Sequence, residues 1–106
     1  MKLSLFLLPQ AEADIDNASD FIARRNVEKA LSFERAVFDS FDLLCTMAKI
    51  GTPYRTSNPN LTDLRMWFVK GFEKYLIFYI PYANYLEVVR VLHSAQDRDS
   101  ILREKD

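Results

Sequence analysis

His93 and several basic residues near it in the chain or in the predicted sheet are the part of this sequence best suited to chemistry. A histidine can act as a general acid or base near neutral pH, and lysine and arginine can hold phosphate groups. Arg90 shortly precedes His93, while Arg65 and Lys74 belong to neighbouring predicted strands. Together they could grip a phosphate and protonate a leaving group, which suits RNA cleavage. These four residues are therefore the candidate catalytic residues.

A structural interpretation of the same residues stays open. His93 could hydrogen-bond a carbonyl group where its strand ends, and Arg90 could pair with Glu87 or Asp97, because structural networks also contain ionisable groups. The sequence does not decide between this interpretation and the catalytic one.

Other kinds of site are poorly represented. One histidine and one cysteine cannot form a structural zinc site, and two glycines leave no phosphate-binding glycine loop. Cys45 is expected to be an inert, buried thiol on the core side of a helix. We therefore expect no metal site and no cofactor.

Three apolar runs between residues 64 and 97 must position the candidate residues. They read LRMWFV, YLIFYI and LEVVRVLH, and their β-branched and aromatic residues are typical of strands. Gly71 can adopt the positive φ of a tight turn in the first connection, and Pro81 and Asn84 favour a turn in the second. The pattern predicts a three-stranded antiparallel meander.

Aromatic residues of the meander could form a binding surface. Alternation along its first strand places Arg65, Trp67 and Val69 on one face of the sheet. If that face is open, Trp67 and Phe72 form an apolar patch of the kind that binds a partner, and Tyr75 extends it. If the face is covered, these residues belong to the core.

The first half of the chain predicts a strand and two helices. Residues 2–8 are apolar and end at Pro9, a residue favoured at the first position of a helix. Asn26 is a good N-cap for a second helix, predicted from Val27 to about Ala48. Apolar residues of the first helix recur with the helical period, at Ala11, Ile15, Ala18 and Ile22.

The predicted order is strand, helix, helix, loop (residues 49–63), three strands and a short helix from Arg98 to about Lys105. The helices should form an antiparallel hairpin that packs on one face of an antiparallel sheet, giving a single two-layer α+β domain over residues 1–106. Ile101 and Leu102 alone anchor the terminal helix, so we expect it to dock weakly. The other face of the sheet is then open, or is covered by the terminal segment or a partner.

Composition narrows the class of protein. A net charge of −1 argues against a protein that coats nucleic acid. Residues 1–48 carry eight acidic and five basic side chains, whereas residues 49–98 carry seven basic and four acidic ones, so the sheet half is mildly positive. No apolar run approaches the roughly 18 residues of a membrane span, and LSLFLL near the start lacks a signal-peptide cleavage site. With a single cysteine, this predicts a cytoplasmic protein without a membrane partner.

The chain resembles the RelE/ParE toxin superfamily, and most closely its ParE-like, or plasmid stabilisation, branch. The resemblance begins at PQAEADIDNASDFIARRN and continues through KALSFERAVFDSFDLL and the loop IGTP. It is strongest in LRMWFVKGFEKYLIFYI and VVRVLHSAQD, and it covers nearly the whole chain. It implies the two-layer RelE/ParE-like fold.

The resemblance implies a small bacterial toxin that a cognate antitoxin binds and neutralises. ParE-like members resemble inhibitors of DNA gyrase that trap the enzyme on cleaved DNA, whereas RelE-like members are ribosome-dependent mRNA endonucleases on the same fold. The expected antitoxin is ParD-like, with a ribbon-helix-helix part, so that operator DNA is reached only through the antitoxin.

The sequence departs from both branches. Tyr75, beside Lys74, stands where nuclease relatives carry a basic residue, although His93 lies where some of them place a catalytic histidine. The common ParE-like ending His-Gly-Ala-Arg-Asp is HSAQD here, at residues 93–97. We therefore prefer a gyrase inhibitor that is not an enzyme, followed by a ribosome-dependent RNase and by a weakened toxin that only binds antitoxin.

The resemblance also implies a binding surface. We expect the antitoxin to contact apolar side chains of the helical hairpin and of the sheet edge, and to form salt bridges with basic residues. The candidate residues for binding antitoxin or target are Arg24, Arg25, Arg65, Trp67, Phe72, Tyr75 and Arg98.

Overall fold

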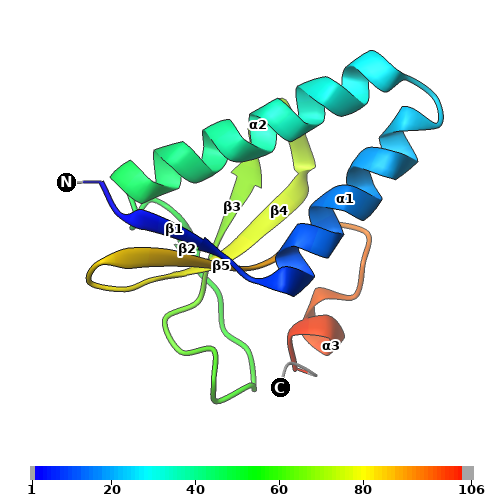
Figure 1. Ribbon diagram of the computed structural model, residues 1–106. Helices are drawn as coiled ribbons and strands as arrows, with labels where there is room; N and C mark the ends of the chain where they lie inside the picture. Colours follow the sequence, from blue (N-terminus) through cyan, green and yellow to red (C-terminus); the bar gives the residue numbers. More distant parts are fainter. Residues whose placement is uncertain (1, 104–106) are drawn as a thin grey trace.

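The computed structural model of the chain describes residues 2–103 and shows a helical hairpin packed across a five-stranded sheet (Figure 1). The strand order is β1-β5-β4-β3-β2, in which β1 runs parallel to β5 and the other neighbours are antiparallel. The predicted α+β architecture and the meander are thus confirmed, while β2 and the parallel pairing of β1 were not predicted. The elements are β1 (Ser4–Leu7), α1 (Pro9–Ala23), α2 (Val27–Thr46), β2 (Thr52–Pro53), β3 (Arg65–Val69), β4 (Phe72–Pro81), β5 (Tyr85–His93) and α3 (Arg98–Arg103).

Local sequence signals set the turns and the helix ends. α1 begins at Pro9, as predicted. The side-chain oxygen of Asn26 accepts a hydrogen bond of 3.0 Å from the backbone N–H of Lys29, so the predicted N-cap of α2 is confirmed. α2 ends at Thr46, slightly before the predicted Ala48. Gly71 has the expected positive φ, of 84°, between β3 and β4.

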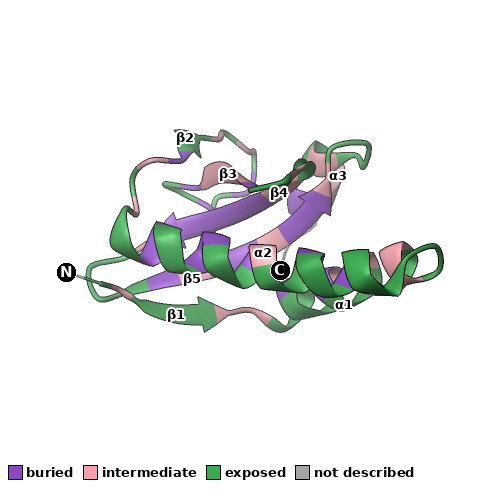
Figure 2. Cartoon of the chain, turned by 90° about the horizontal axis from the view of Figure 1, so that it is seen from above, coloured by how far each residue is buried: buried purple, intermediate pink, exposed green. Residues whose placement is uncertain are grey.

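The hairpin buries its apolar stripes against one face of the sheet. Burying a large apolar side chain stabilises the fold by about 1.5–3 kcal/mol, so this layer is a main source of stability. Figure 2 shows the consequence, because the outer surfaces of α1 and α2 are exposed while much of β4 and β5 is buried. The fully or almost fully buried residues of this layer are Ala11, Ile15, Phe33, Val37, Phe41, Leu44, Cys45, Val69, Ile77, Tyr79, Leu86, Val88 and Val91.

The second face of the sheet is covered by α3 and by the loop between β2 and β3. Leu102 is 0% exposed, and the side-chain amide of Asn58 donates a hydrogen bond of 3.0 Å to the Leu102 carbonyl. The hydroxyl of Tyr54 also donates a hydrogen bond to Asp99. The expectation that α3 docks weakly was therefore wrong, because the loop supplies partners that its own sequence does not reveal. The predicted end of this helix at Lys105 lies outside the described residues.

An irregularity in β5 changes which side chains face the helices. The register between β4 and β5 shifts at Phe78 and Tyr79, so that Phe78 pairs with Arg90 and Tyr79 pairs with Val88. Consecutive residues Arg90 and Val91 consequently both contact the helical layer. Regular alternation would place them on opposite faces, and a β-bulge of this kind re-aims a side chain.

Candidate functional site

Arg90 is held by an acidic residue of α1. Its Nε and a terminal nitrogen donate to the two carboxylate oxygens of Asp14 at 2.7 and 2.8 Å, and the N–H of Val91 donates to the same carboxylate at 3.0 Å. The Asp14 hydrogen bond is the largest cause of a raised pKa at Arg90. The predicted pairing of Arg90 with Glu87 or Asp97 was therefore wrong. The only sequence signal for Asp14 was its position at the margin of the apolar face, next to Ile15.

Arg65 and Tyr79 together hold the backbone that follows α2, and we call this group the carbonyl clamp. Arg65 donates to the carbonyls of Gly51 at 2.6 Å and Lys49 at 3.1 Å. The Tyr79 hydroxyl donates to the carbonyl of Ala48 at 2.7 Å and accepts the N–H of Gly51 at 3.0 Å. Burial raises the pKa of Tyr79, so its hydroxyl remains a donor. Both side chains are engaged in fixing a loop.

Gly51 belongs to the carbonyl clamp because of close packing. A Cβ at this position would lie 2.8 Å from Cε1 and 2.9 Å from Cζ of Tyr79. Only a residue without a side chain allows the tyrosine ring to approach this backbone.

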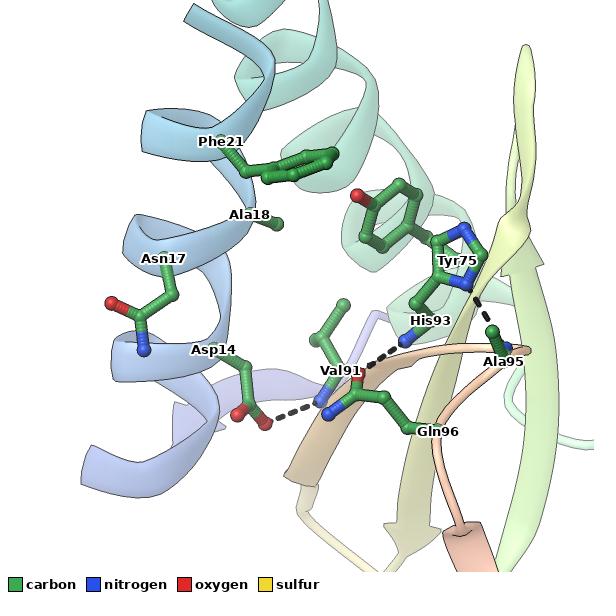
Figure 3. A pocket seen from close by; sticks show the side chains of 9 residues that line it. All are labelled: Asp14, Asn17, Ala18, Phe21, Tyr75, Val91, His93, Ala95 and Gln96. Atoms are coloured by element: carbon green, nitrogen blue, oxygen red, sulfur yellow. Dashed lines mark hydrogen bonds between the residues drawn. The ribbon is translucent and has the colours of Figure 1, made fainter. Parts of the chain in front are cut away.

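His93 ends β5 with its ring fixed from several sides (Figure 3). Its Nδ1 accepts the backbone N–H of Ala95 at 3.0 Å, and its own backbone N–H donates to the side-chain oxygen of Gln96 at 2.8 Å. The ring stands edge-on to that of Tyr75, with centroids 4.9 Å apart. Since an accepting Nδ1 carries no proton, the proton of the neutral ring lies on Nε2. The neutral ring of His93 therefore presents a hydrogen-bond donor at Nε2.

A hollow of about 410 Å³ lies between α1 and the end of β5, and we call it the His93 hollow (Figure 3). One wall is apolar and includes Phe21, whose side chain is largely exposed at 64%. The Asn17 amide and the Tyr75 hydroxyl make no hydrogen bond to any other described residue. Burial raises the pKa of Tyr75, so the hydroxyl keeps its proton. The lining residues are Asp14, Asn17, Ala18, Phe21, Tyr75, Val91, His93, Ala95 and Gln96.

A second hollow of about 420 Å³ shares Tyr75 and His93 with the first and includes Lys29 and Lys74. The carbonyl of Lys74 accepts the N–H of Ser94 at 2.7 Å, which fixes the strand carrying Lys74 next to His93. Neither lysine forms an ion pair with another residue of the described part of the chain. We call this the lysine hollow.

The candidate nuclease residues are thus brought together only in part. His93 and Lys74 line one hollow. Arg90 is paired with Asp14. Arg65 binds backbone carbonyls, and it pairs with Tyr79 in the sheet, whereas His93 pairs with Tyr75, four residues earlier on β4. Neither arginine lines the hollow that contains His93 and Lys74.

The aromatic candidates do not form an exposed patch. Trp67 and Phe72 are half-buried and pack against the core beneath the helices. The ring of Phe72 stands edge-on to that of Phe33, with ring centroids 5.3 Å apart. The interpretation of Trp67 and Phe72 as core residues is therefore confirmed. The Tyr75 ring also contacts that of Phe33, with ring centroids 4.9 Å apart, but Tyr75 lines the His93 hollow as well.

The remaining basic candidates, Arg24, Arg25 and Arg98, lie at the ends of helices. Arg24 and Arg25 are exposed at the turn between α1 and α2, without an ion pair to the rest of the described chain. Arg98 begins α3 and reaches the carbonyl of Ser94 at 3.5 Å.

Exposed apolar residues lie on the helical hairpin and on the sheet edge, the two places where we expected apolar contacts with the antitoxin, and not at Trp67 and Phe72. Val27, Leu31 and Phe38 are exposed along one side of α2. Leu5 and Phe6 are exposed on the edge strand β1, where Phe6 contacts Tyr85. The helical period alone does not tell which apolar residues of α2 stay uncovered, as the exposure of Phe38 shows.

Within residues 2–103, no three histidine, cysteine or acidic side chains lie close enough together to hold a metal ion. In the same range, no helix combines the length and apolar character needed to cross a bilayer.

Comparisons with known proteins relate this chain to a sequence family and to a solved structure. The sequence model of the family described as "ParE toxin of type II toxin-antitoxin system, parDE" matches residues 5–98. A solved structure described as "Chromosomal ParDE TA system from P. aeruginosa" is similar with a TM-score of 0.68 and 18% identity, over 87% of this chain and 96% of that chain. The comparison with curated proteins found no match. The structural likeness supports the fold, and the family match covers most of the chain.

Proposed function

Because the chain belongs to the ParE toxin family of type II toxin–antitoxin systems, we propose that it inhibits DNA gyrase and that its cognate antitoxin neutralises it by direct binding. The family match over residues 5–98 is the observation that carries this proposal. The proposed antitoxin is ParD-like and of the ribbon-helix-helix type, so the toxin reaches operator DNA only as part of the complex. The proposed place of action is the cytoplasm.

The arginines support binding rather than catalysis. A bidentate pair between arginine and carboxylate is among the stronger hydrogen-bonded contacts in proteins, and Arg90 already makes one with Asp14. Arg65 is likewise engaged by the carbonyls of Lys49 and Gly51. A phosphodiester would have to displace Asp14 before it could bind the same two nitrogens of Arg90, and Nη1 of Arg65 is already bonded to the loop carbonyls.

The outer side of α2 is the proposed contact for an antitoxin helix. Val27, Leu31 and Phe38 lie on one side of the helix at spacings of four and seven, which is the pattern of a helix-to-helix contact. Arg24 and Arg25 lie at the end of this stripe and could pair with acidic residues of the antitoxin. Leu31→Glu should weaken antitoxin binding at least about tenfold with little change in thermal stability, because the side chain is exposed. Equal affinity would move the contact to another surface.

The test of the proposed function is a supercoiling and DNA-cleavage assay with purified protein and gyrase. The proposal predicts inhibited supercoiling with accumulation of cleaved DNA, and relief of both effects by the antitoxin encoded next to this chain. Normal supercoiling at protein concentrations well above those of gyrase would contradict it.

A ribosome-dependent RNase is the second candidate, supported by the position of His93 and Lys74 around one hollow. This candidate predicts that His93→Ala abolishes toxicity and mRNA cleavage on ribosomes. Full toxicity of His93→Ala would refute it.

A weakened toxin is the third candidate, supported by the HSAQD ending in place of His-Gly-Ala-Arg-Asp. Here the glutamine at position 96 binds the His93 backbone, and the arginine of the common ending is missing. Growth arrest on controlled expression, relieved by antitoxin, would refute this candidate.

A further inference from the structure

The His93 hollow and the lysine hollow adjoin each other, because Tyr75 and His93 line both, and we call the two together the depression. Their volumes are about 410 and 420 Å³. Figure 3 shows Phe21 and Tyr75 facing each other across the first hollow, with His93 beside Tyr75. A ligand of extended shape could therefore contact both hollows at once.

The two ends of this depression differ in chemistry. The end at α1 is lined by Ala18, Phe21 and Val91, of which Phe21 is largely exposed. The acidic group at that end, Asp14, is neutralised by its pair with Arg90. An apolar side chain is the complement of such a surface, since it would remove the exposed aromatic ring from water.

The other end is cationic. Lys29 and Lys74 have no ion-pair partner among the residues described. The one acidic residue of this hollow, Glu73, accepts the N–H of Gly71 at 2.8 Å. A carboxylate is the complement of two unpaired ammonium groups, and such complementarity contributes to both rate and specificity of association.

Between the two ends lie hydrogen-bond donors. The fixed tautomer of His93 presents Nε2–H, and the Tyr75 hydroxyl is uncommitted. The amide of Asn17, which lies on α1 at the rim of the first hollow, also has no partner within the described chain. Donors in this position suit the carbonyl groups of a peptide backbone.

These observations favour a peptide over RNA. An RNA strand is held by cations that follow its backbone, whereas the positive charge here is confined to one end. The two arginines that could extend the charge are held by Asp14 and by backbone carbonyls.

We propose that this depression binds an extended segment of the antitoxin, which places an apolar side chain against Phe21 and a carboxylate between Lys29 and Lys74. The inference rests on the proposed function, since it names a second antitoxin contact on the same toxin, separate from the outer side of α2. It also gives His93 a role as a hydrogen-bond donor to the partner.

The test is the dissociation constant of the full-length toxin with its neighbouring antitoxin, measured by calorimetry. Phe21→Ala and Lys74→Glu should each raise Kd at least about tenfold, which corresponds to ~1.4 kcal/mol. Lys49→Glu is the matched control, because it makes the same charge change on an exposed lysine outside both hollows and should change Kd less than about twofold. Both affected side chains are exposed, so melting temperatures should stay unchanged.

Two further measurements distinguish a lost contact from a misfolded variant. They are the salt dependence of Kd and the effect of a compensating charge change in the antitoxin. The Kd of the unmodified toxin should rise with salt concentration, and Lys74→Glu should reduce that slope. One acidic residue of the antitoxin, when changed to lysine, should restore binding to Lys74→Glu and so identify the carboxylate.

The outcomes separate the two proposals. If Phe21→Ala and Lys74→Glu bind antitoxin as tightly as Lys49→Glu does, the depression does not bind the antitoxin, although the proposed function stands. If the unmodified toxin does not bind the antitoxin, the proposed function itself fails. If the two variants keep antitoxin affinity and lose mRNA cleavage on ribosomes, the depression is a nucleic-acid site and the inference is overturned.

Discussion

The carbonyl clamp and the His93 hollow use the same kinds of residue in opposite ways. In the clamp, the Tyr79 hydroxyl makes two hydrogen bonds and Arg65 binds two carbonyls. In the His93 hollow and the adjoining lysine hollow, the Tyr75 hydroxyl and the Lys74 ammonium have no partner in the described chain. The residue type therefore does not separate a structural group from a binding group, but the count of its satisfied hydrogen bonds does.

Gly51→Ala is the substitution expected to have the largest effect on this contrast. The added Cβ would overlap the Tyr79 ring and break the clamp, so the free energy of unfolding should fall by about 2–4 kcal/mol. Urea denaturation would measure it. Gly71→Asn is the control, since space is open there and asparagine tolerates a positive φ, and it should cost less than about 1 kcal/mol. Equal losses would show that the clamp is not tightly packed.

The next comparison is between two tyrosine-to-phenylalanine changes. Tyr79→Phe leaves the carbonyl of Ala48 and the N–H of Gly51 without their partner in a buried site, and should destabilise the protein by about 1–3 kcal/mol. Tyr75→Phe removes a hydroxyl without a partner in the described chain and should change stability by less than about 0.5 kcal/mol. Thermal and urea unfolding of both variants would test this. A large loss for Tyr75→Phe would mean that its hydroxyl has a structural role.

The smallest expected effect concerns the segment that follows the His93 turn. Hydrogen bonds from the Ser100 side chain and backbone lower the pKa of Asp97 below its ordinary value of 3.8. A lowered pKa in the folded state stabilises it above the ordinary value, and this contribution is lost as the pH falls through the folded-state value. The stability difference between the unmodified protein and Asp97→Ala should therefore shrink between about pH 5 and pH 3. A difference that stays constant over this range would show that the hydrogen bonds between Ser100 and the Asp97 carboxylate do not stabilise the fold.

Much of the fold could be predicted because its signals are local. The meander followed from apolar alternation and Gly71, and the start of α2 followed from Asn26. The parallel pairing of β1 with β5 brings together residues such as Ser4 and Tyr85, which no local pattern links. The docking of α3 likewise depends on Asn58, a loop residue distant in sequence.

The site could be predicted only in outline. His93 and Lys74 were singled out and do lie together, because both follow from strand pairing in the meander. The partner of Arg90 was missed, since a bulge turns its side chain toward Asp14. Arg65 was taken as a candidate phosphate or partner contact because nothing in its neighbourhood revealed the carbonyls of Lys49 and Gly51. Long-range hydrogen bonds of this kind have no signature in a single sequence.

The most direct test of the account is the antitoxin affinity of Arg65→Met and Lys74→Met, with the melting temperature of each variant measured alongside. Both changes remove one positive charge and keep a chain of similar length. The account predicts that Arg65→Met lowers the melting temperature and leaves the Kd of the folded protein unchanged, while Lys74→Met raises Kd and leaves the melting temperature unchanged. In the reverse result, Lys74→Met would destabilise the fold and Arg65→Met would weaken antitoxin binding. That result would contradict the assignment of a structural role to the carbonyl clamp and a binding role to the lysine hollow.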